Sequence, residues 1–235
     1  MWRTRLLRFV AGFGFLLVML IVLFAGLIPV IHRWGATGAE VAQPMPGDDL
    51  VTHPVVDWTH GMTINAPPDE VWPWIIQMGD TRAGFYSYTF IENLVVKVTT
   101  DPSYGVVYRN ANRIVPAWQD PQPGLAIIQD AIQIERIQPG EWLLAQSRMP
   151  EMMNWVWVWQ VRPIDEGRRT RLLVRMLIEI PDSAGMGNPA IGFFMDVGGF
   201  VMDRGMMLGI KERAEGKVEP AYIEAIEIGM WLIAL

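Results

Sequence analysis

The 235-residue chain has no cysteine and only three histidines. The lack of cysteine excludes disulfide bonds, thiolate metal sites and a cysteine nucleophile. The sequence also lacks the HxxxH spacing of metal-binding helices and the GxSxG motif of serine hydrolases. The pattern therefore predicts no metal ion, no cofactor and no catalytic residue of these classes.

Acidic residues are missing from the first 33 positions, which carry four of the 19 basic residues. The rest of the chain holds the other 15 basic residues and all 25 acidic ones, a formal charge of −10. Such a charge repels a phosphate backbone, and no basic patch with interleaved aromatic residues is present. We therefore expect no nucleic-acid partner, and the sequence identifies no protein partner.

Charged residues are also absent from the 23 residues of Phe9–Ile31. At about 1.5 Å per residue, a helix of this length spans roughly 34 Å, which is enough to cross a hydrocarbon core of about 30 Å. We predict a transmembrane anchor over residues 1–33. The alternatives are a cleaved signal sequence, for which the apolar run is long, and a buried core helix, for which a polar face is missing.

The flanking charges predict the orientation of this anchor. Arg3, Arg5 and Arg8 precede the apolar run, whereas only His32 and Arg33 follow it closely. By the positive-inside rule, the N-terminus lies in the cytoplasm and the rest of the chain lies on the extracytoplasmic side. The prediction is a single-pass membrane protein.

Residues 34–57 are rich in glycine, proline and acidic residues and show neither helical nor strand periodicity. We interpret them as a tether that holds the domain near the bilayer without fixing its orientation. The folded domain is expected at 58–217, and an apolar tail at 218–235 follows it. The apolar end of the tail is too short to span a bilayer.

Several motifs occur in an order that resembles a known superfamily. An alternating strand at 58–64 is followed by Ala-Pro-Pro-x-x-Val-Trp at 66–72, Gln-Met-Gly at 77–79, Arg-Ala-Gly-Phe-Tyr-Ser-Tyr at 82–88 and Ile-Glu-Asn-Leu at 91–94. Over about 45–215 the chain resembles the START-like (SRPBCC) superfamily, and within it the polyketide cyclase/dehydrase and lipid-transport group. The resemblance implies an α+β helix-grip fold. In this fold a curved antiparallel sheet wraps around a long C-terminal helix and leaves an apolar cavity between them.

The later sequence shows which faces of two strands point inward. Strand periodicity runs from 125 to 180, with turns near 138–140, 150 and 165–167. The shared parity of their side chains places one set of residues toward the core: Trp155, Trp157, Trp159, Val161, Leu172, Val174, Met176, Ile178 and Ile180. On the second strand the charged side chains Arg169, Arg171, Arg175 and Glu179 share the opposite parity.

A long helix is predicted over 189–215, where an Asn-Pro start is followed by a stripe of small and flexible residues. The stripe consists of Ile191, Met195, Gly198, Met202, Gly205, Met206 and Gly209. The glycines either let the helix backbone approach the tryptophans of the sheet, or leave volume for an apolar ligand. Asp196 and Asp203 lie on the opposite face and are interpreted as solvated carboxylates. Phe193, Phe200 and Met207 form a second apolar stripe, which we expect the tail or a membrane surface to cover.

Together these features predict a membrane-anchored binding module for a hydrophobic small molecule such as a lipid, an isoprenoid or a polyketide-like compound. The expected ligand-binding residues are Arg82, Phe85, Tyr86, Trp155, Trp157, Trp159, Met195, Gly198, Met202 and Met206. Arg82 either bonds loop carbonyls or meets an acidic head group. One alternative is a cyclase- or dehydratase-type enzyme with His60, Tyr86 and Arg82 as acid–base candidates, although His60 reads first as a core histidine. Another is a scaffold without a ligand.

Overall fold

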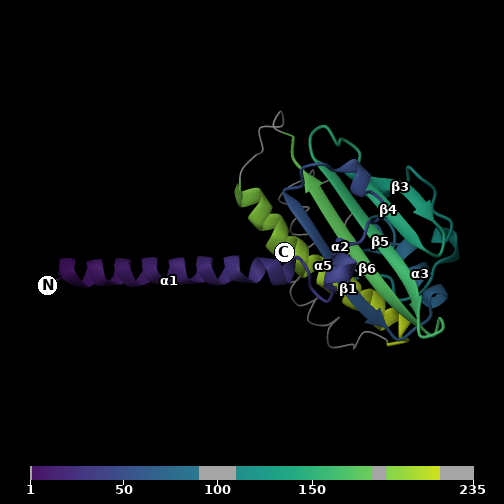
Figure 1. Ribbon diagram of the computed structural model, residues 1–235, viewed down its shortest axis with the longest axis horizontal. Helices are drawn as coiled ribbons and strands as arrows, with labels where there is room; N and C mark the ends of the chain where they lie inside the picture. Colours follow the sequence, from purple (N-terminus) through teal and green to yellow (C-terminus); the bar gives the residue numbers. More distant parts are fainter. Residues whose placement is uncertain (1, 90–109, 182–188, 218–235) are drawn as a thin grey trace.

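The computed structural model describes residues 2–89, 110–181 and 189–217 of the chain (Figure 1). A curved six-stranded antiparallel sheet packs against a long C-terminal helix, and an N-terminal helix projects from this body. The fold is α+β and has the helix-grip arrangement predicted from the sequence. The motif at 91–94 and the predicted tail at 218–235 lie outside the described residues.

The helices and strands follow one another in a simple order. The helices are α1 (Trp2–Ile31), α2 (Gly38–Ala42), the 3-10 helix η1 (Asp48–Leu50), α3 (Pro68–Ile76), the 3-10 helix η2 (Pro116–Trp118) and α5 (Pro189–Ala214). The strands are β1 (Val56–Ile64), β2 (Ala126–Ile128), β3 (Ile132–Gln138), β4 (Trp142–Ser147), β5 (Asn154–Ile164) and β6 (Arg169–Glu179). The spatial order β1-β6-β5-β4-β3-β2 makes β2 to β6 a meander, with β1 added beside β6.

Helix α1 contains the stretch Ala11–Ile31, which is long and apolar enough to cross a membrane. This property of the stretch rests on its length and composition alone. Little of the stretch is buried against the rest of the protein, and Figure 1 shows the helix extending away from the sheet.

The inner face of the sheet is covered by α3 and α5. The side chains predicted to point inward from β5 and β6 do so and join one core cluster with Trp58, Met62 and Ile64 of β1. Helix α3 is buried in the same cluster through Val71, Trp74 and Ile75, and the nearby Met78 joins them. Strand parity therefore predicted the inner faces of β5 and β6 correctly.

The outer face of the sheet is also buried, which the predicted tether had not suggested. Met45 and Val51 pack on Leu144, Val156, Val158, Leu173 and Leu177, which form a second apolar cluster on this side. Residues 34–57 thus cover the middle of the sheet and contain α2 and η1, so the prediction of a loose tether is wrong. The physical reason is that alternate residues of β5 and β6 are apolar on both faces and need a cover on each.

Arginines of β6 hold this covering segment in place. Arg175 is 5% exposed; its guanidinium donates to Asp48 Oδ2 at 2.7 Å, to the carbonyl of Val41 at 2.7 Å and to Thr59 Oγ1 at 2.9 Å. Arg171 donates to both carboxylate oxygens of Glu40 at 2.7 and 2.8 Å. The acidic residues of the segment therefore pair with outward-facing arginines that looked solvated in the sequence.

The free edge of β1 is closed by the residues that directly follow α1. The amide of Thr59 donates to the carbonyl of His32 at 2.9 Å, and that of Gly61 to the carbonyl of Trp34 at 3.0 Å. Gly35 has a φ of +67°, and a Cβ there would lie 2.1 Å from the Gly61 carbonyl oxygen. This close approach requires glycine, and the backbone pairing protects an edge that would otherwise be open to other strands.

Acid should loosen the covering segment through Glu40. The hydrogen bond from Arg171 is the main reason that the pKa of Glu40 falls from 4.5 to about 2 in the folded protein. A carboxylate with a lowered folded-state pKa stabilises the fold above its ordinary pKa, and this contribution is lost as the pH falls toward 2. We expect the stability difference between wild type and Glu40→Gln, measured by urea unfolding, to shrink steadily between pH 4.5 and 2. A stability difference that does not change with pH would contradict the lowered pKa of Glu40 and its hydrogen bond with Arg171 as the cause.

Candidate functional site

Three tryptophans of β5 form a row on the inner face of the sheet. The ring centroids of Trp157 and Trp159 are 4.2 Å apart, and those of Trp155 and Trp157 are 6.0 Å apart. Trp159 is fully buried, Trp157 is 7% exposed and Trp155 is half-buried. Their indole Nε1 atoms are all buried; among the described residues those of Trp155 and Trp159 have no hydrogen-bond partner, whereas that of Trp157 interacts with the carboxyl of Asp203. The row therefore presents N–H donors inside an otherwise apolar region.

Phe85 extends this aromatic surface. Its ring is stacked at 6.3 Å on that of Trp157, and its side chain is half-buried. Met195 and Gly198 of α5 are half-buried as well, and Met195 packs against the same core cluster. Met202 is half-buried and contacts Ser87, with Oγ and Sδ 3.9 Å apart. These predicted site residues thus border the core without being sealed in it.

Met206 differs from the other predicted methionine positions. It is 1% exposed and belongs to the core cluster together with Met207, Ile210 and Ala214 of the same helix. The C-terminal half of α5 is therefore packed tightly on the sheet and on α3. The half-buried predicted positions are found in the N-terminal half.

Two glycines of α5, Gly205 and Gly209, allow a loop to pack closely against the helix. A Cβ at Gly209 would lie 2.1 Å from the carbonyl oxygen of Tyr86, and one at Gly205 would lie 2.6 Å from Ser87 Oγ. For these two positions the close-approach interpretation is correct, but the approaching segment is the loop 86–88 and not the sheet tryptophans. Gly199, in contrast, would place a Cβ 3.8 Å from Trp58, an ordinary contact distance.

Tyr86 is held rigidly in that loop. It has a φ of 59°, and its phenolic oxygen accepts a hydrogen bond from Gln77 Nε2 at 2.9 Å. The guanidinium of Arg213 lies 4.7 Å from the centre of its ring, a cation–π contact. Burial raises the pKa of the Tyr86 hydroxyl above its ordinary value, so the phenol stays protonated. Tyr86 is thus a structural residue that orients the loop.

Arg82 binds carbonyl groups at the end of α3, as one of its two interpretations predicted. Its guanidinium donates to the carbonyls of Ile76 and Met78, while its Nε atom is buried without a partner. Desolvation lowers the pKa of Arg82 from its ordinary value. The side chain also borders a surface hollow of about 420 Å³, whose other lining residues are Ala117, Trp118, Asp120, Pro121, Gln122, Pro123 and Leu125. Arg82 alone among the ten predicted ligand-binding residues lines this hollow.

A buried histidine–aspartate pair, which sequence reasoning missed, lies where α1, β1 and α5 meet. His60 Nδ1 is 2.5 Å from Asp203 Oδ2, and the two side chains are 0% and 1% exposed. His60 Nε2 donates to the carbonyl of Ile31, the last residue of α1, at 2.8 Å. The imidazole is stacked on Trp58 at 4.1 Å, and the ring of Phe200 meets it edge-on.

The groups around this pair determine where its protons lie. A carbonyl only accepts hydrogen bonds, so Nε2 of His60 carries a proton, and a second proton is shared between Nδ1 and Asp203. Burial raises the pKa of the Asp203 carboxyl, and the hydrogen bond with His60 opposes that rise. The pair is neutral overall whichever partner holds the shared proton, which makes its burial tolerable.

A second pair of the same kind lies nearby. His32 Nε2 is 2.8 Å from Asp196 Oδ1, and Asp196 is 7% exposed. The prediction that Asp196 and Asp203 are solvated is therefore wrong, because α5 turns this side toward β1 and the end of α1. Phe200 and Met207 likewise face inward, so the second apolar stripe needs no outer cover at these two positions; the side chain of Phe193 lies outside the described residues. The sequence contained one signal for these buried pairs: Asp196 and Asp203 lie seven residues apart on an apolar helix.

None of the three acid–base candidates of the enzyme hypothesis is free to act. Both ring nitrogens of His60 are bonded, the Tyr86 hydroxyl accepts from Gln77, and Arg82 is engaged with carbonyls. In the part of the chain that the structure describes, no three His, Asp or Glu side chains gather in an arrangement that would hold a metal ion.

Comparison with known proteins gives structural similarity only. No protein-family model and no curated protein matches the chain. Similar solved structures include protein NE0264 from Nitrosomonas europaea, with 10% identity, coverage of 74% of this chain and 99% of that chain, and a TM-score of 0.38. KanY has 14% identity, coverage of 70% and 99%, and a TM-score of 0.39. The di-domain ARO/CYC StfQ from the steffimycin biosynthetic pathway has 15% identity, coverage of 68% and 51%, and a TM-score of 0.36. Similarity at this level carries no information about ligand or activity.

Removing one partner of the buried pair should be costly, whereas removing both should not. Asp203→Leu leaves His60 Nδ1 buried without a partner, and breaking a buried pair in this way costs about 3–5 kcal/mol. The double variant His60→Phe, Asp203→Leu replaces both polar groups with apolar ones and should recover much of that loss. Urea unfolding of the single and double variants of the full chain measures the coupling. Additive effects of the two substitutions would refute the pair as a unit.

Two glycines of α5 should respond in opposite directions to the same substitution. Gly209→Ala forces the Tyr86 loop away and should destabilise the fold by about 1–3 kcal/mol, as overpacking does. Gly192→Ala meets its nearest neighbour at 4.0 Å and should stabilise the helix by up to about 1 kcal/mol. Thermal unfolding compares them directly, and equal effects at both positions would disprove the tight contact.

Proposed function

We propose that this chain is a membrane-anchored domain that binds an apolar small molecule carrying a hydrogen-bond acceptor. The ligand lies against the tryptophans of β5 and the N-terminal half of α5. The observation that carries the proposal is the two buried indole N–H groups of Trp155 and Trp159, which have no acceptor among the described residues. An unpaired buried donor costs about 1–3 kcal/mol, and a carbonyl, carboxyl or hydroxyl oxygen on a ligand would remove that cost.

The neighbouring side chains support this type of ligand. Phe85 and Trp155 offer flat apolar surfaces, and Met195 and Met202 are flexible side chains that adapt to varied shapes. All four are half-buried, as expected for groups that a bound molecule would finish covering. A lipid, an isoprenoid or a polyketide-like compound combines the required apolar body with an oxygen at one end.

Membership of the START-like superfamily and anchoring by α1 are part of the proposal. The motif order of the sequence and the sheet wrapped around α5 support the first. The apolar stretch Ala11–Ile31 supports the second. The basic residues before this stretch favour a cytoplasmic N-terminus and an extracytoplasmic domain.

Exchanging one indole for a phenyl ring tests the site. In Trp155→Phe the ring remains aromatic but the unpaired N–H donor is lost, so the ligand should bind about 2- to 10-fold more weakly, the value of one hydrogen bond. Trp142→Phe is the matched control, because Trp142 packs on the outer apolar cluster. The full chain is assayed in lipid nanodiscs by energy transfer from tryptophan to a fluorescent polyene fatty acid, with empty nanodiscs as background.

Native mass spectrometry of the same variants gives an independent measure through the fraction of chain that retains a co-purified molecule. If Trp155→Phe unfolds, Trp159→Phe removes the other unpaired donor of the row. Equal binding by the inner-face and outer-face variants would overturn the proposed site.

A further inference from the structure

The N-terminal half of α5 is unusually apolar for a helix at the surface of a domain. Residues 189–202 contain one charged residue, Asp196, which is 7% exposed and bonded to His32. Val201 is 39% exposed, and Val197 is half-buried. A solvated helix face normally carries charged side chains, and an apolar one indicates a partner.

This half of α5 lies beside the end of α1. Figure 1 shows α5 passing the point where α1 joins the domain, and α1 and α5 are in contact. The bonds His60–Ile31 and His32–Asp196 fix the position of α1 relative to β1 and α5. The N-terminal half of α5 therefore lies at the depth at which α1 would leave a bilayer.

Basic and aromatic side chains surround this junction. Arg33 and Arg204 are exposed, and the guanidinium of Arg204 lies 5.5 Å from the centre of the Trp34 ring. Tryptophan favours the membrane interface, and arginine attracts lipid phosphates. These two arginines stand out because residues 34–235 carry a formal charge of −10.

We propose that the N-terminal half of α5, together with Arg33, Trp34 and Arg204, rests on the bilayer surface from which α1 emerges. The partner is the lipid surface itself, which covers the apolar face and meets the two arginines with its phosphates. The domain is consequently held in one orientation, with the side of the ligand site formed by Met195 and Met202 next to the lipid. This inference rests on the proposed anchoring by α1.

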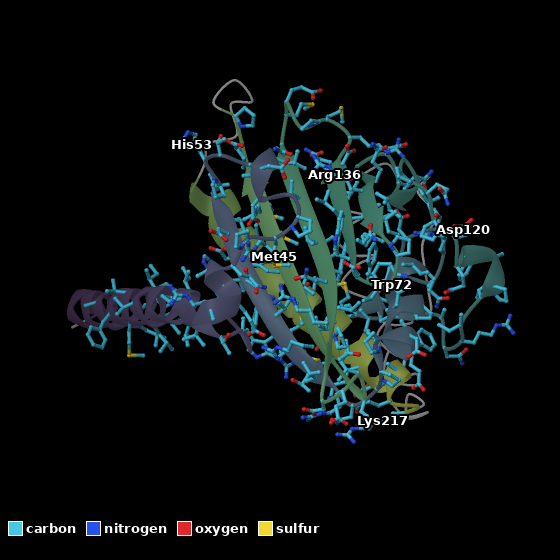
Figure 2. All side chains as sticks on the ribbon, turned by 45° about the vertical axis from the view of Figure 1, so that its right-hand side comes forward. Met45, His53, Trp72, Asp120, Arg136 and Lys217 are labelled. Carbon is cyan, nitrogen blue, oxygen red and sulfur yellow. The ribbon has the colours of Figure 1, made fainter. Side chains whose placement is uncertain are left out.

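The absence of cysteine makes a direct test simple, because one introduced cysteine carries a single spin label. Val201→Cys is compared with Asp120→Cys, an exposed position that Figure 2 shows on the side of the domain away from α1. The full chain is placed in nanodiscs of phosphatidylcholine and phosphatidylglycerol. Collisions with lipid-soluble oxygen and with a water-soluble nickel chelate are then measured.

We expect the ratio of oxygen to nickel accessibility to be several-fold higher at 201 than at 120. Arg33→Glu with Arg204→Glu should lower the ratio at 201, whereas Arg168→Glu, an exposed arginine in the β5–β6 turn, should leave it unchanged. Equal ratios at the two positions would overturn the inference, as would a label at 201 that is shielded from both reagents by protein.

The outcome separates this inference from the ligand proposal. Loss of fatty-acid binding in Trp155→Phe has no effect on the accessibility at 201, and a domain without a fixed orientation has no effect on that binding. Failure of the full chain to remain in nanodiscs would refute the anchor and the orientation together while leaving the tryptophan row open to the mass-spectrometric test.

Discussion

The buried pair of His60 and Asp203 is the interaction on which the arrangement of the molecule depends. It joins the middle of β1 to α5, and through Nε2 of His60 it reaches the last residue of α1. Such a pair is stable in an apolar setting only when every donor has an acceptor, and here the Ile31 carbonyl supplies the remaining one. One polar cluster thus ties three elements that are far apart in the sequence to a single geometry.

The same constraint explains why the segment after α1 is not loose. Once Ile31 is fixed, His32 and Trp34 pair with the edge of β1, and Gly35 provides the close approach that this pairing needs. Glu40 and Asp48 then meet Arg171 and Arg175 on the outer face of the sheet. The chain is therefore continuous and ordered from the apolar helix into the domain, and a membrane-bound α1 would set the orientation of everything that follows.

The location of the proposed ligand site follows from the difference between the two halves of α5. The C-terminal half is packed on the core, and its glycines receive the Tyr86 loop, which leaves no space for a ligand there. The N-terminal half has half-buried methionines, lies near the end of α1 and is almost free of charge. A site that lies between this half, the tryptophans of β5 and a lipid surface would suit molecules that partition into membranes.

Local patterns in the sequence determined much of the fold. Parity along β5 and β6 predicted the inner face, helical spacing predicted α5, and the uncharged run predicted α1, because each depends on side chains a few residues apart. The sequence also pointed to the tryptophans and methionines as a group. Contacts between distant residues were not predictable in this way. The pairs His60–Asp203 and Arg175–Asp48 join residues 143 and 127 positions apart, and only the packing of the sheet brings them together. Asp196 and Asp203, which were interpreted as solvated from the sequence, are buried partners because the tertiary structure supplies a histidine for each.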